Sequence, residues 1–368
     1  MERAECPNPQ NCGVRARRDV RRRAEPRRPV RLGVEYATVK PDRVRRSPRA
    51  VAIVLVAVLA GAACKQHRPR LRWGIGVQTF DATALGLAHA RSADAFVDAL
   101  RPGRLTIPTY DGSNQATHPD VLVERDGAGV HVTMAMTPYP FSNARLENPS
   151  LLVSSDGMAF TAPAGVAAPL VQAPAKDHNN DPDLRRDPRT GEYELLYLES
   201  LRPERQNLVA LRSKDKQTWT RRDAIVYDLT KGAPFMVSPA AIDDGGKTYL
   251  FYVDTVSVTL NVLVSADGMT WDPATAAPVK LALGGIKPWH LDVFRGEDGF
   301  GMLISGYTTA FTHQDLYLAT SPDLVTWTLR PAPLMAWTDP ALGAESLYRS
   351  TGVVEHGTLI VWYAMQYP

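Results

Sequence analysis

Three pairs of side chains in this 368-residue sequence share one spacing and could do chemistry together. The pairs are His118 with Asp120, Asp181 with Asp183, and His290 with Asp292. Residues two apart on a β-strand face the same way, so both members of a pair would line one surface. Four carboxylates and two imidazoles gathered at one place are costly to desolvate unless a ligand, water or metal pairs with them. The pairs therefore indicate a site, although aspartates in such positions also accept backbone N–H bonds and close turns.

The elements that must position these pairs come from a repeat. The pattern Ser-x-Asp-x-x-x-aromatic occurs four times, with steps of 59, 52 and 56 residues between its aspartates. The four copies cover residues 154–160, 213–219, 265–271 and 321–327. Each copy follows a short apolar run that predicts a strand. Its Asp and Ser can cap a turn while the aromatic side chain packs the next strand onto a sheet, so we expect these turns to be structural.

Each repeat unit also contains two earlier strands joined by a turn. The turn residues are Asp126-Gly127, Thr190-Gly191, Gly245-Gly246 and Asp298-Gly299. Units of about 55 residues with three or four strands are typical of propeller blades. A fifth unit begins at Tyr348 and stops at Pro368, before any third strand.

These units predict an all-β fold, a five-bladed β-propeller over residues 104–368. Residues 65–103 would form an N-terminal extension with a short helix at 92–100. The outer strand that the fifth blade lacks would come from the N-terminal side, from residues 76–80 or 104–108, because an open sheet edge is prone to aggregate.

The blade starts and turns resemble those of the five-bladed propeller glycosidases, which include the arabinanase/β-xylosidase and β-fructosidase families. The features that carry the resemblance are Asp-Pro-x-hydrophobic blade starts, as at Asp181, and the Ser-Pro-Asp-Leu-Val-Thr-Trp turn at 321–327. Residues 134–140 with 147–149 resemble an uncharacterised bacterial branch of this group, and the resemblance covers about residues 105–368. Sialidase propellers also carry such turns, but theirs have one more residue between Asp and Trp and accompany an arginine triad that we do not find.

The resemblance implies that three acids hydrolyse a glycosidic bond: a base on blade one, a second acid on blade two and a glutamate proton donor on blade three. Asp181 matches the second position, whereas His118 stands where the blade-one aspartate is expected, with Asp120 two residues on. A Ser-Pro pair at 238–239 stands where the blade-three glutamate is expected, and Glu147 could replace that glutamate as proton donor. We therefore expect the catalytic residues to be Asp181, Asp120 and Glu147.

Sugar binding would draw on aromatic faces and on planar hydrogen-bond donors. Tyr139 and Trp289 could stack on a sugar ring, and Arg349 could bind a carboxylate or a pair of hydroxyls. Trp289 could instead fill space between blades, and Arg349 could instead pair with Glu345. The substrate-binding residues that we expect are His118, Asp183, His290, Asp292, Arg349, Tyr139 and Trp289.

The N-terminal region differs from the rest of the chain. Residues 1–49 are rich in Arg and Pro and lack apolar periodicity, which predicts a disordered tail. Residues 50–64 predict a signal segment, because they are apolar and small and end at Cys64, a candidate lipidation site. Gly61 departs from the usual lipoprotein cleavage box, so an ordinary signal peptide or an uncleaved anchor stays open. Translation could also start near Val44.

The net charge of +3 divides unevenly along the chain, with +9 on residues 1–50 and −6 on residues 51–368. The basic character belongs to the tail, so the folded part gives no reason to expect nucleic-acid binding. The three cysteines are Cys6, Cys12 and Cys64. Residues 65–368 therefore contain neither a disulfide nor a cysteine-ligated metal.

The sequence thus predicts an exported glycoside hydrolase, a monomer in the cell envelope or outside the cell, whose partner is a glycan. We expect it to meet a membrane only through its N-terminal lipid or signal anchor. We expect no metal or other cofactor, with calcium as the alternative that axial histidines leave open. The second hypothesis is a non-catalytic propeller that binds carbohydrate or protein at the cell surface, because propellers host both functions.

Overall fold

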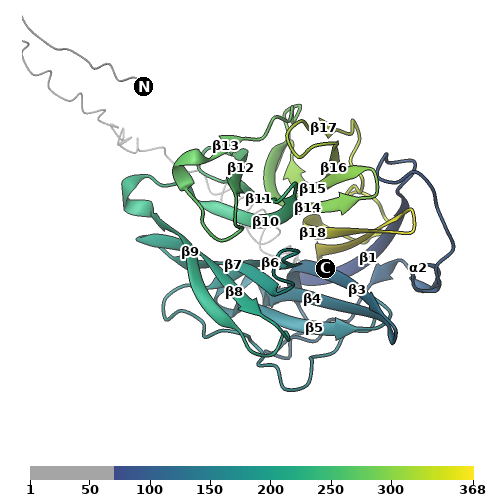
Figure 1. Ribbon diagram of the computed structural model, residues 1–368, viewed down its shortest axis with the longest axis horizontal. Helices are drawn as coiled ribbons and strands as arrows, with labels where there is room; N and C mark the ends of the chain where they lie inside the picture. Colours follow the sequence, from purple (N-terminus) through teal and green to yellow (C-terminus); the bar gives the residue numbers. More distant parts are fainter. Residues whose placement is uncertain (1–69) are drawn as a thin grey trace, which may run out of the picture. The chain divides into compact units, whose positions relative to one another are not determined.

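A computed structural model describes residues 70–368 of the chain (Figure 1). The predicted tail and the predicted signal segment with Cys64 lie outside the described residues. The described part contains five antiparallel sheets of three or four strands, arranged around one axis as propeller blades. This arrangement confirms the predicted all-β, five-bladed fold.

Blades one to four each follow the chain from the innermost strand outward. Blade one contains β3 (Ala116–Asp126), β4 (Gly129–Pro138) and β5 (Ser150–Ser154). Blade two contains β6 (Asn179–Arg186), β7 (Tyr193–Leu201), β8 (Arg205–Ser213) and β9 (Thr220–Asp228). Blade three contains β10 (Met236–Asp244), β11 (Lys247–Asp254), β12 (Thr259–Ser265) and β13 (Ala277–Pro278). Blade four contains β14 (Lys287–Gly296), β15 (Gly299–Tyr307), β16 (Asp315–Ser321) and β17 (Thr328–Leu329).

Blade five joins the two ends of the described chain. Its strands, from the axis outward, are β18 (Ser346–Glu355), β19 (Thr358–Tyr367), β1 (Arg72–Asp81) and β2 (Gly103–Arg104). β1 pairs with β19 along its whole length, from Arg72 with Tyr367 to Asp81 with Thr358. The closing strand expected at 76–80 therefore lies within β1. Because β1 belongs to the segment expected to be an N-terminal extension, the sheet of blade five begins well before residue 104.

Helical segments in the described part are short. α2 (Ala95–Ala99) lies inside the predicted helical region, and Asp94 caps it by accepting the backbone N–H groups of Phe96 and Val97. The 3-10 turns are η1 (Pro140–Ser142), η2 (Ala144–Leu146), η3 (Leu229–Lys231) and η4 (Pro273–Thr275). Within residues 70–368, no helix has the length and apolar character that a membrane span requires.

The four repeat turns lie at the ends of third strands, as predicted, because β5, β8, β12 and β16 each end on the repeat serine. In each turn the Asp side chain accepts the backbone N–H groups two and three residues further on, as Asp323 does from Val325 and Thr326 at 2.9 Å each. The aromatic residue then packs inward. Trp271 and Trp327 are only 7% and 4% exposed.

The inner and middle strands of the blades are largely buried, because each blade packs between two neighbours. In β19 every residue from Leu359 to Met365 is buried, so this strand forms a continuous apolar run rather than an alternating pattern. Apolar clusters fill the space between blades, as Leu291, Phe251 and Trp327 do between blades three and four. These packed blades give the polar residues of the inner strands a rigid support at the axis.

Candidate functional site

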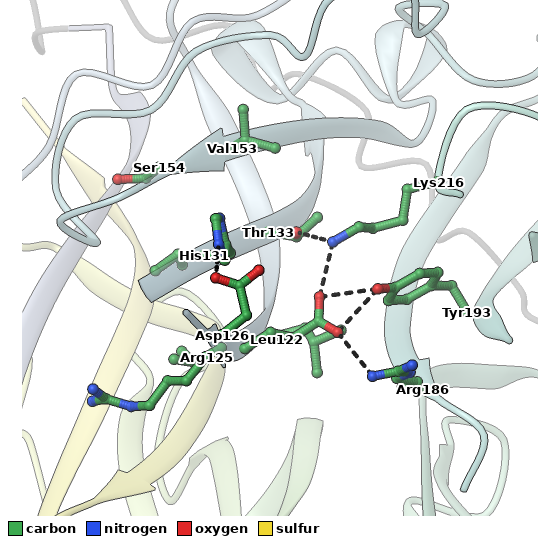
Figure 2. A pocket seen from close by; sticks show the side chains of 13 residues that line it. Leu122, Arg125, Asp126, His131, Thr133, Val153, Ser154, Arg186, Tyr193 and Lys216 are labelled. Carbon is green, nitrogen blue, oxygen red and sulfur yellow. Dashed lines mark hydrogen bonds and ion pairs between the residues drawn. The ribbon is translucent and has the colours of Figure 1, made fainter. Parts of the chain in front are cut away.

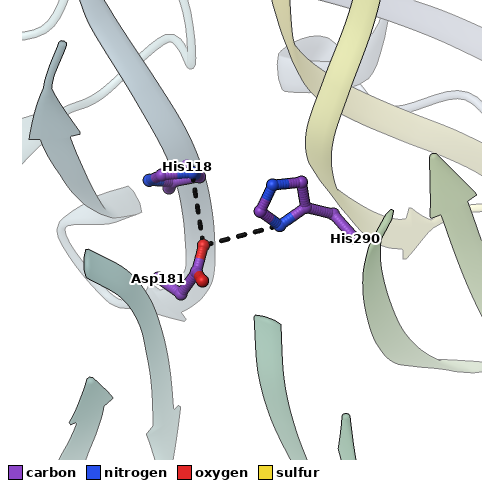
Figure 3. A group of neighbouring side chains, drawn as sticks. All are labelled: His118, Asp181 and His290. Atoms are coloured by element: carbon purple, nitrogen blue, oxygen red, sulfur yellow. Dashed lines mark ion pairs between the residues drawn. The ribbon is translucent and has the colours of Figure 1, made fainter. Parts of the chain in front are cut away.

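Three of the predicted residues form one buried group, here called the histidine–aspartate cluster: His118, Asp181 and His290 (Figure 3). They come from β3, β6 and β14, the innermost strands of blades one, two and four. Nε2 of His118 lies 3.2 Å from Oδ1 of Asp181, and Nδ1 of His290 lies 3.5 Å from the same oxygen. Each residue is at most 2% exposed.

A β-bulge in each inner strand sets the direction of these side chains. The bulges lie between Thr117 and Asp120 in β3, between Asn180 and Asp183 in β6, and between Pro288 and His290 in β14. Inside their bulges His118 and Asp181 have φ values of 51° and 53°, and Ser238 has 56° at the same point of blade three. A left-handed backbone is uncommon outside glycine. Its recurrence at matching points of three blades is typical of functional positions.

Hydrogen bonds hold the atoms of the cluster that point away from its other members, whereas the atoms that face one another have no hydrogen-bond partner among the described residues. Nδ1 of His118 bonds to Oγ1 of Thr137 at 2.9 Å, and Oδ2 of Asp181 accepts the backbone N–H of Ser238 at 3.1 Å. Nε2 of His118, Oδ1 of Asp181 and both ring nitrogens of His290 have no hydrogen-bond partner among the described residues. Buried polar atoms are nearly always paired in folded proteins, so these atoms indicate a water, ion or ligand between them.

Glu147 lies beside the cluster, directly after η2. It is 4% exposed, and its Oε2 lies 3.6 Å from Nδ1 of His118. Burial, with the charge of Asp181, raises the pKa of the Glu147 carboxyl well above its ordinary value. A carboxyl that takes up a proton more readily than usual is suited to proton transfer. The predicted proton donor is therefore in contact with the cluster.

Burial and nearby charges favour the neutral form of the two imidazoles. Burial lowers the pKa of His118 and of His290 well below the ordinary value, and the Arg349 guanidinium lowers both further. At His290 the charge of Asp181 opposes this effect. Neutral imidazole is the form that binds a metal ion.

Aromatic rings line the cluster. The ring of Tyr348 lies 4.1 Å from that of His290 and 5.4 Å from that of His118, and Trp289 donates its indole N–H to the Tyr348 hydroxyl at 3.0 Å. Tyr139 stacks at 6.5 Å from His118. Burial raises the pKa of Tyr139 to about 12 and that of Tyr348 well above its ordinary value, so both phenols keep their protons and can donate. The predicted residues Tyr139 and Trp289 thus belong to this wall.

Tyr348 and Trp73 are residues of this wall that the sequence analysis missed. Trp73 is 5% exposed and packs 5.2 Å from Tyr139 and 4.8 Å from Tyr348. It lies on β1, so its place follows only from the closure of blade five. Tyr348 had a usable signal, because it opens the fifth repeat unit and so lies near the start of the innermost strand of blade five.

A second group, here called the aspartate ring, lies two residues further along the same strands: Asp120, Asp183 and Asp292. Each carboxylate accepts a backbone N–H from the inner strand of the next blade, Asp183 from Ala241 at 3.0 Å and Asp292 from Gly352 at 3.1 Å. Asp120 accepts in the same way from Leu184. The sequence left open that these aspartates accept backbone N–H groups. In the structure they do so, and the bonds join neighbouring blades. Burial raises the pKa of all three carboxyls, that of Asp292 to about 7.

Some of the predicted site residues lie at the aspartate ring and not at the histidine–aspartate cluster. Asp120, expected as a catalytic residue, and Asp183 and Asp292, expected to bind substrate, use their oxygens to join blades. Arg349 is 1% exposed, donates to the carbonyl of Pro239 at 3.0 Å and lies 3.6 Å from Asp183. It therefore faces the aspartate ring.

The histidine–aspartate cluster fits a divalent transition metal. Bonds from zinc to nitrogen or oxygen are about 2.0–2.2 Å, so tetrahedral ligands lie about 3.4 Å apart. The two distances to Oδ1 of Asp181 are 3.2 and 3.5 Å, and the ligand atoms of all three residues lie within 4.8 Å of one another. Two imidazoles and one carboxylate are the donors of several catalytic metal sites, which keep a further position open. The ground for expecting no metal was the lack of a zinc-type His/Cys spacing in the sequence, and that ground does not apply to residues drawn from three blades.

Comparisons with known proteins come from both sequence and structure. No family model matches the chain. The chain is 25% identical over 342 residues to the A type blood N-acetyl-alpha-D-galactosamine deacetylase of Flavonifractor plautii. The match covers 75% of this chain and 44% of that protein, so the chain spans less than half the length of this relative.

Solved structures show the same fold. A crystal structure of an N-acetylgalactosamine deacetylase from F. plautii, in complex with blood group B trisaccharide, superposes with a TM-score of 0.59 at 21% identity, covering 80% of this chain and 86% of that one. A thermostable family-43 glycoside hydrolase gives 0.51 at 11% identity, covering 72% and 91%. An endo-arabinase from Bacteroides thetaiotaomicron gives 0.50 at 14% identity, covering 72% and 96%. The chain therefore has the five-bladed propeller that glycoside hydrolases and a sugar deacetylase share, which confirms the predicted resemblance.

Proposed function

We propose that this protein is a metal-dependent, glycan-directed hydrolase that removes the acetyl group from an N-acetylated sugar. One observation carries the proposal: two buried imidazole nitrogens, of His118 and His290, lie 3.2 and 3.5 Å from Oδ1 of Asp181, and none of these three atoms has a hydrogen-bond partner among the described residues. The curated relative, which is named as a deacetylase of an N-acetylated sugar, supports the class of reaction.

His118, Asp181 and His290 would hold the metal. A divalent metal bound there supplies Lewis-acid chemistry, polarising a carbonyl group and making a bound water more acidic. Two hydrogen bonds would fix the directions of two of these ligands: Nδ1–H of His118 donates to Oγ1 of Thr137, and the Ser238 N–H donates to Asp181. Such supporting bonds orient ligands and tune their basicity.

Glu147 would move the proton. Water adds to the carbonyl carbon of the acetamido group, the carbon–nitrogen bond breaks, and acetate and a free amine leave. Glu147 would accept the proton of the attacking water and return it to the departing nitrogen, a transfer that suits its raised pKa. Tyr348, which already accepts the indole N–H of Trp289, can donate a hydrogen bond from its own hydroxyl to the carbonyl oxygen as negative charge develops there.

The sequence-based glycoside hydrolase is the second candidate. It is favoured by the pair of interacting acids, since the charge of Asp181 helps to raise the pKa of Glu147, as expected of a proton donor beside a second carboxylate. In that reaction Glu147 would protonate the leaving oxygen, and no metal would be needed. The non-catalytic binder is the remaining alternative.

The deciding experiment separates acetate release from sugar release. The purified protein is analysed for bound metal, then incubated with an oligosaccharide that ends in N-acetyl-D-galactosamine and with a panel of neutral glycosides, with and without EDTA. We expect bound metal at about one ion per chain, acetate release that EDTA abolishes, and recovery on adding zinc, cobalt or manganese. Reducing-sugar release that survives EDTA would instead establish the glycosidase. Glycan binding without either product would establish the binder.

We also propose that the protein is an exported, monomeric lipoprotein modified at Cys64. The support is the apolar segment 50–64, which ends in that cysteine. Palmitate labelling of cells that express the full chain or Cys64→Ser tests it. Label in both proteins, or in neither, would contradict lipidation at Cys64.

A further inference from the structure

A cavity of about 650 Å³ lies between blades one and two, far from the histidine–aspartate cluster (Figure 2). Its walls come from β3, β4 and β5 and from three blade-two side chains, Arg186, Tyr193 and Lys216. Glu124 lines it and lies six residues beyond His118 on β3. A strand rises about 3.3 Å per residue, so about 20 Å separates the two along the strand. The cavity is therefore a separate feature at the other end of blade one.

Glu124 is held in place by blade two. It accepts hydrogen bonds from Nζ of Lys216 at 2.9 Å and from the Tyr193 hydroxyl at 3.0 Å, and Nη1 of Arg186 lies 3.6 Å away (Figure 2). Thr133 of β4 also accepts from Lys216, at 3.1 Å. The polar groups on this wall are thus fixed before any ligand arrives.

Lys216 reaches the cavity from a strained backbone. Its φ is 60°, in the left-handed region, at the position of the repeat turn where the sister turns of blades one and three carry Gly157 and Gly268. The fourth sister turn carries Leu324, which is 2% exposed and packs in the core. Lys216 is not buried in a core; its ammonium lies over Tyr193 at 4.6 Å and faces the cavity. Strain that persists in a folded protein is commonly found at binding positions.

The lining favours a neutral, hydroxyl-rich ligand. Arg186 and Lys216 face Glu124, and Asp126 pairs with His131. Arg125 pairs with Asp94 and Glu355, which are not among the lining residues, so the cavity has no strong excess of either charge. Donors and acceptors lie side by side, which suits hydroxyl groups because each hydroxyl both donates and accepts.

The cavity also has an apolar part. Leu122 and Val153 line it next to the polar groups, and could pack against the C–H face of a sugar ring. A volume of 650 Å³ is within the range of small-molecule sites, about 300–1,000 Å³.

We propose that this cavity is a second sugar-binding site, which takes a neutral sugar unit of the glycan that the enzyme acts on. The inference rests on the proposed function only in naming a glycan as the ligand. A site at the opposite end of blade one would hold the glycan near the enzyme without occupying the histidine–aspartate cluster.

The test uses D-galactose and N-acetyl-D-galactosamine as probes with the full chain. Hydrogen–deuterium exchange locates binding, and calorimetric titration measures its affinity. We expect either sugar to protect peptides that cover residues 122–133. Lys216→Gly and Glu124→Gln should each weaken this binding at least about tenfold.

Lys216→Gly installs the residue of the sister turns, so its melting temperature should stay equal or rise, because glycine accepts the left-handed backbone. Lys214→Ala is the matched control, since it removes the same charge from an exposed position of the same turn. Its affinity should stay within about twofold of the parent.

The outcomes separate this inference from the proposed function. No protection of residues 122–133 at millimolar sugar, or protection that Lys216→Gly leaves intact, overturns the second site, whatever the enzyme assay shows. Protection there that Asp181→Asn leaves unchanged supports the second site. If the protein shows that protection but releases no acetate, the second site stands and the proposed deacetylation fails.

Discussion

Thr351 of blade five donates its hydroxyl hydrogen to Oδ1 of Asp120 of blade one, at 3.0 Å, across 231 positions of sequence. Both side chains are buried. Asp120, Asp183 and Asp292 each accept a backbone N–H from the following blade, and Ser238 and Leu291 join blades three and four through the Ser238 hydroxyl. The Thr351 bond therefore completes a circuit through all five blades. The last blade is thereby joined to the first at the axis. A second connection is the pairing of β1 with β19 within the sheet of blade five.

Thr351→Val tests this circuit, because valine keeps the shape of threonine and removes the donor. A buried carboxyl that loses a hydrogen-bond partner destabilises the fold, and we expect the free energy of unfolding to fall by about 1–3 kcal/mol. Urea denaturation measures the change. An unaltered midpoint would show that the bond contributes nothing to blade closure.

Asp181→Asn tests the cluster. The amide keeps the size of the side chain and can still accept the Ser238 N–H, but it is a poor metal ligand. We expect bound metal to be lost and turnover to fall by about 10²–10⁴-fold, with little change in melting temperature. Metal analysis, an acetate assay and a melting curve on one preparation measure all three.

Asp183→Asn is the control for that prediction, because it makes the same chemical change two residues further along β6, in the aspartate ring. It should retain metal. If Asp181→Asn lowers the melting temperature and leaves metal and turnover unchanged, Asp181 is a structural residue and the proposed site is wrong.

Tyr348→Phe removes one hydroxyl from the aromatic wall. If that hydroxyl stabilises charge on the carbonyl oxygen only in the transition state, kcat should fall by about 10²–10³-fold while KM stays the same. Steady-state kinetics on the acetylated oligosaccharide measure both constants. A change confined to KM would assign Tyr348 to substrate binding.

Trp327→Ala tests the packing role of the repeat turns. Trp327 is 4% exposed and meets Phe251 edge-on at 5.7 Å, so its truncation should lower the free energy of unfolding by about 3–5 kcal/mol. Trp219, at the same position of blade two, is only partly buried, and Trp219→Ala should lose less. Equal losses would mean that burial does not set the contribution of this position.

Asp323→Asn should make stability less sensitive to acid. Backbone N–H bonds from Thr326 and Val325 lower the pKa of the Asp323 carboxyl, so ionised Asp323 stabilises the folded protein above the unfolded value of 3.8, and this contribution is lost as pH falls through the lowered pKa. The variant should therefore melt at a lower temperature than the parent at pH 7, and the difference should shrink toward pH 3. A difference that is constant with pH would argue against a role for the charge.

The fold could be predicted because its signals are local. The turn at Asp323 is specified by residues within one short segment, and four copies at a nearly constant spacing fix the number of strands in each unit. The closing strand was harder to place, because the pairing of β1 with β19 depends on an edge that forms only when all blades are present. The sequence could therefore indicate candidate segments, but not that Trp73 would reach the aromatic wall.

The site could be predicted only in part. Alternation along a strand correctly indicated that His118 and Asp120 both belong to the inner strand of blade one. It could not show the bulge between Thr117 and Asp120, since a bulge is defined by the partner strand. The bulges help to separate the histidine–aspartate cluster from the aspartate ring. The shared spacing did single out His118, Asp181 and His290, but residues spread over 172 positions lack the short spacing by which metal ligands are identified in a sequence.

The pairing of β1 with β19 also sets an order of events in the life of the chain. β1 is made early and its partner is the last strand of the described chain, so during synthesis the four middle blades can form while β1 waits without its neighbour. The contact that completes the ring is the one with the greatest separation in sequence, and such contacts form slowly. Until the final strand emerges, Trp73 cannot take its place beside Tyr348, and the molecule has blades but no finished aromatic wall.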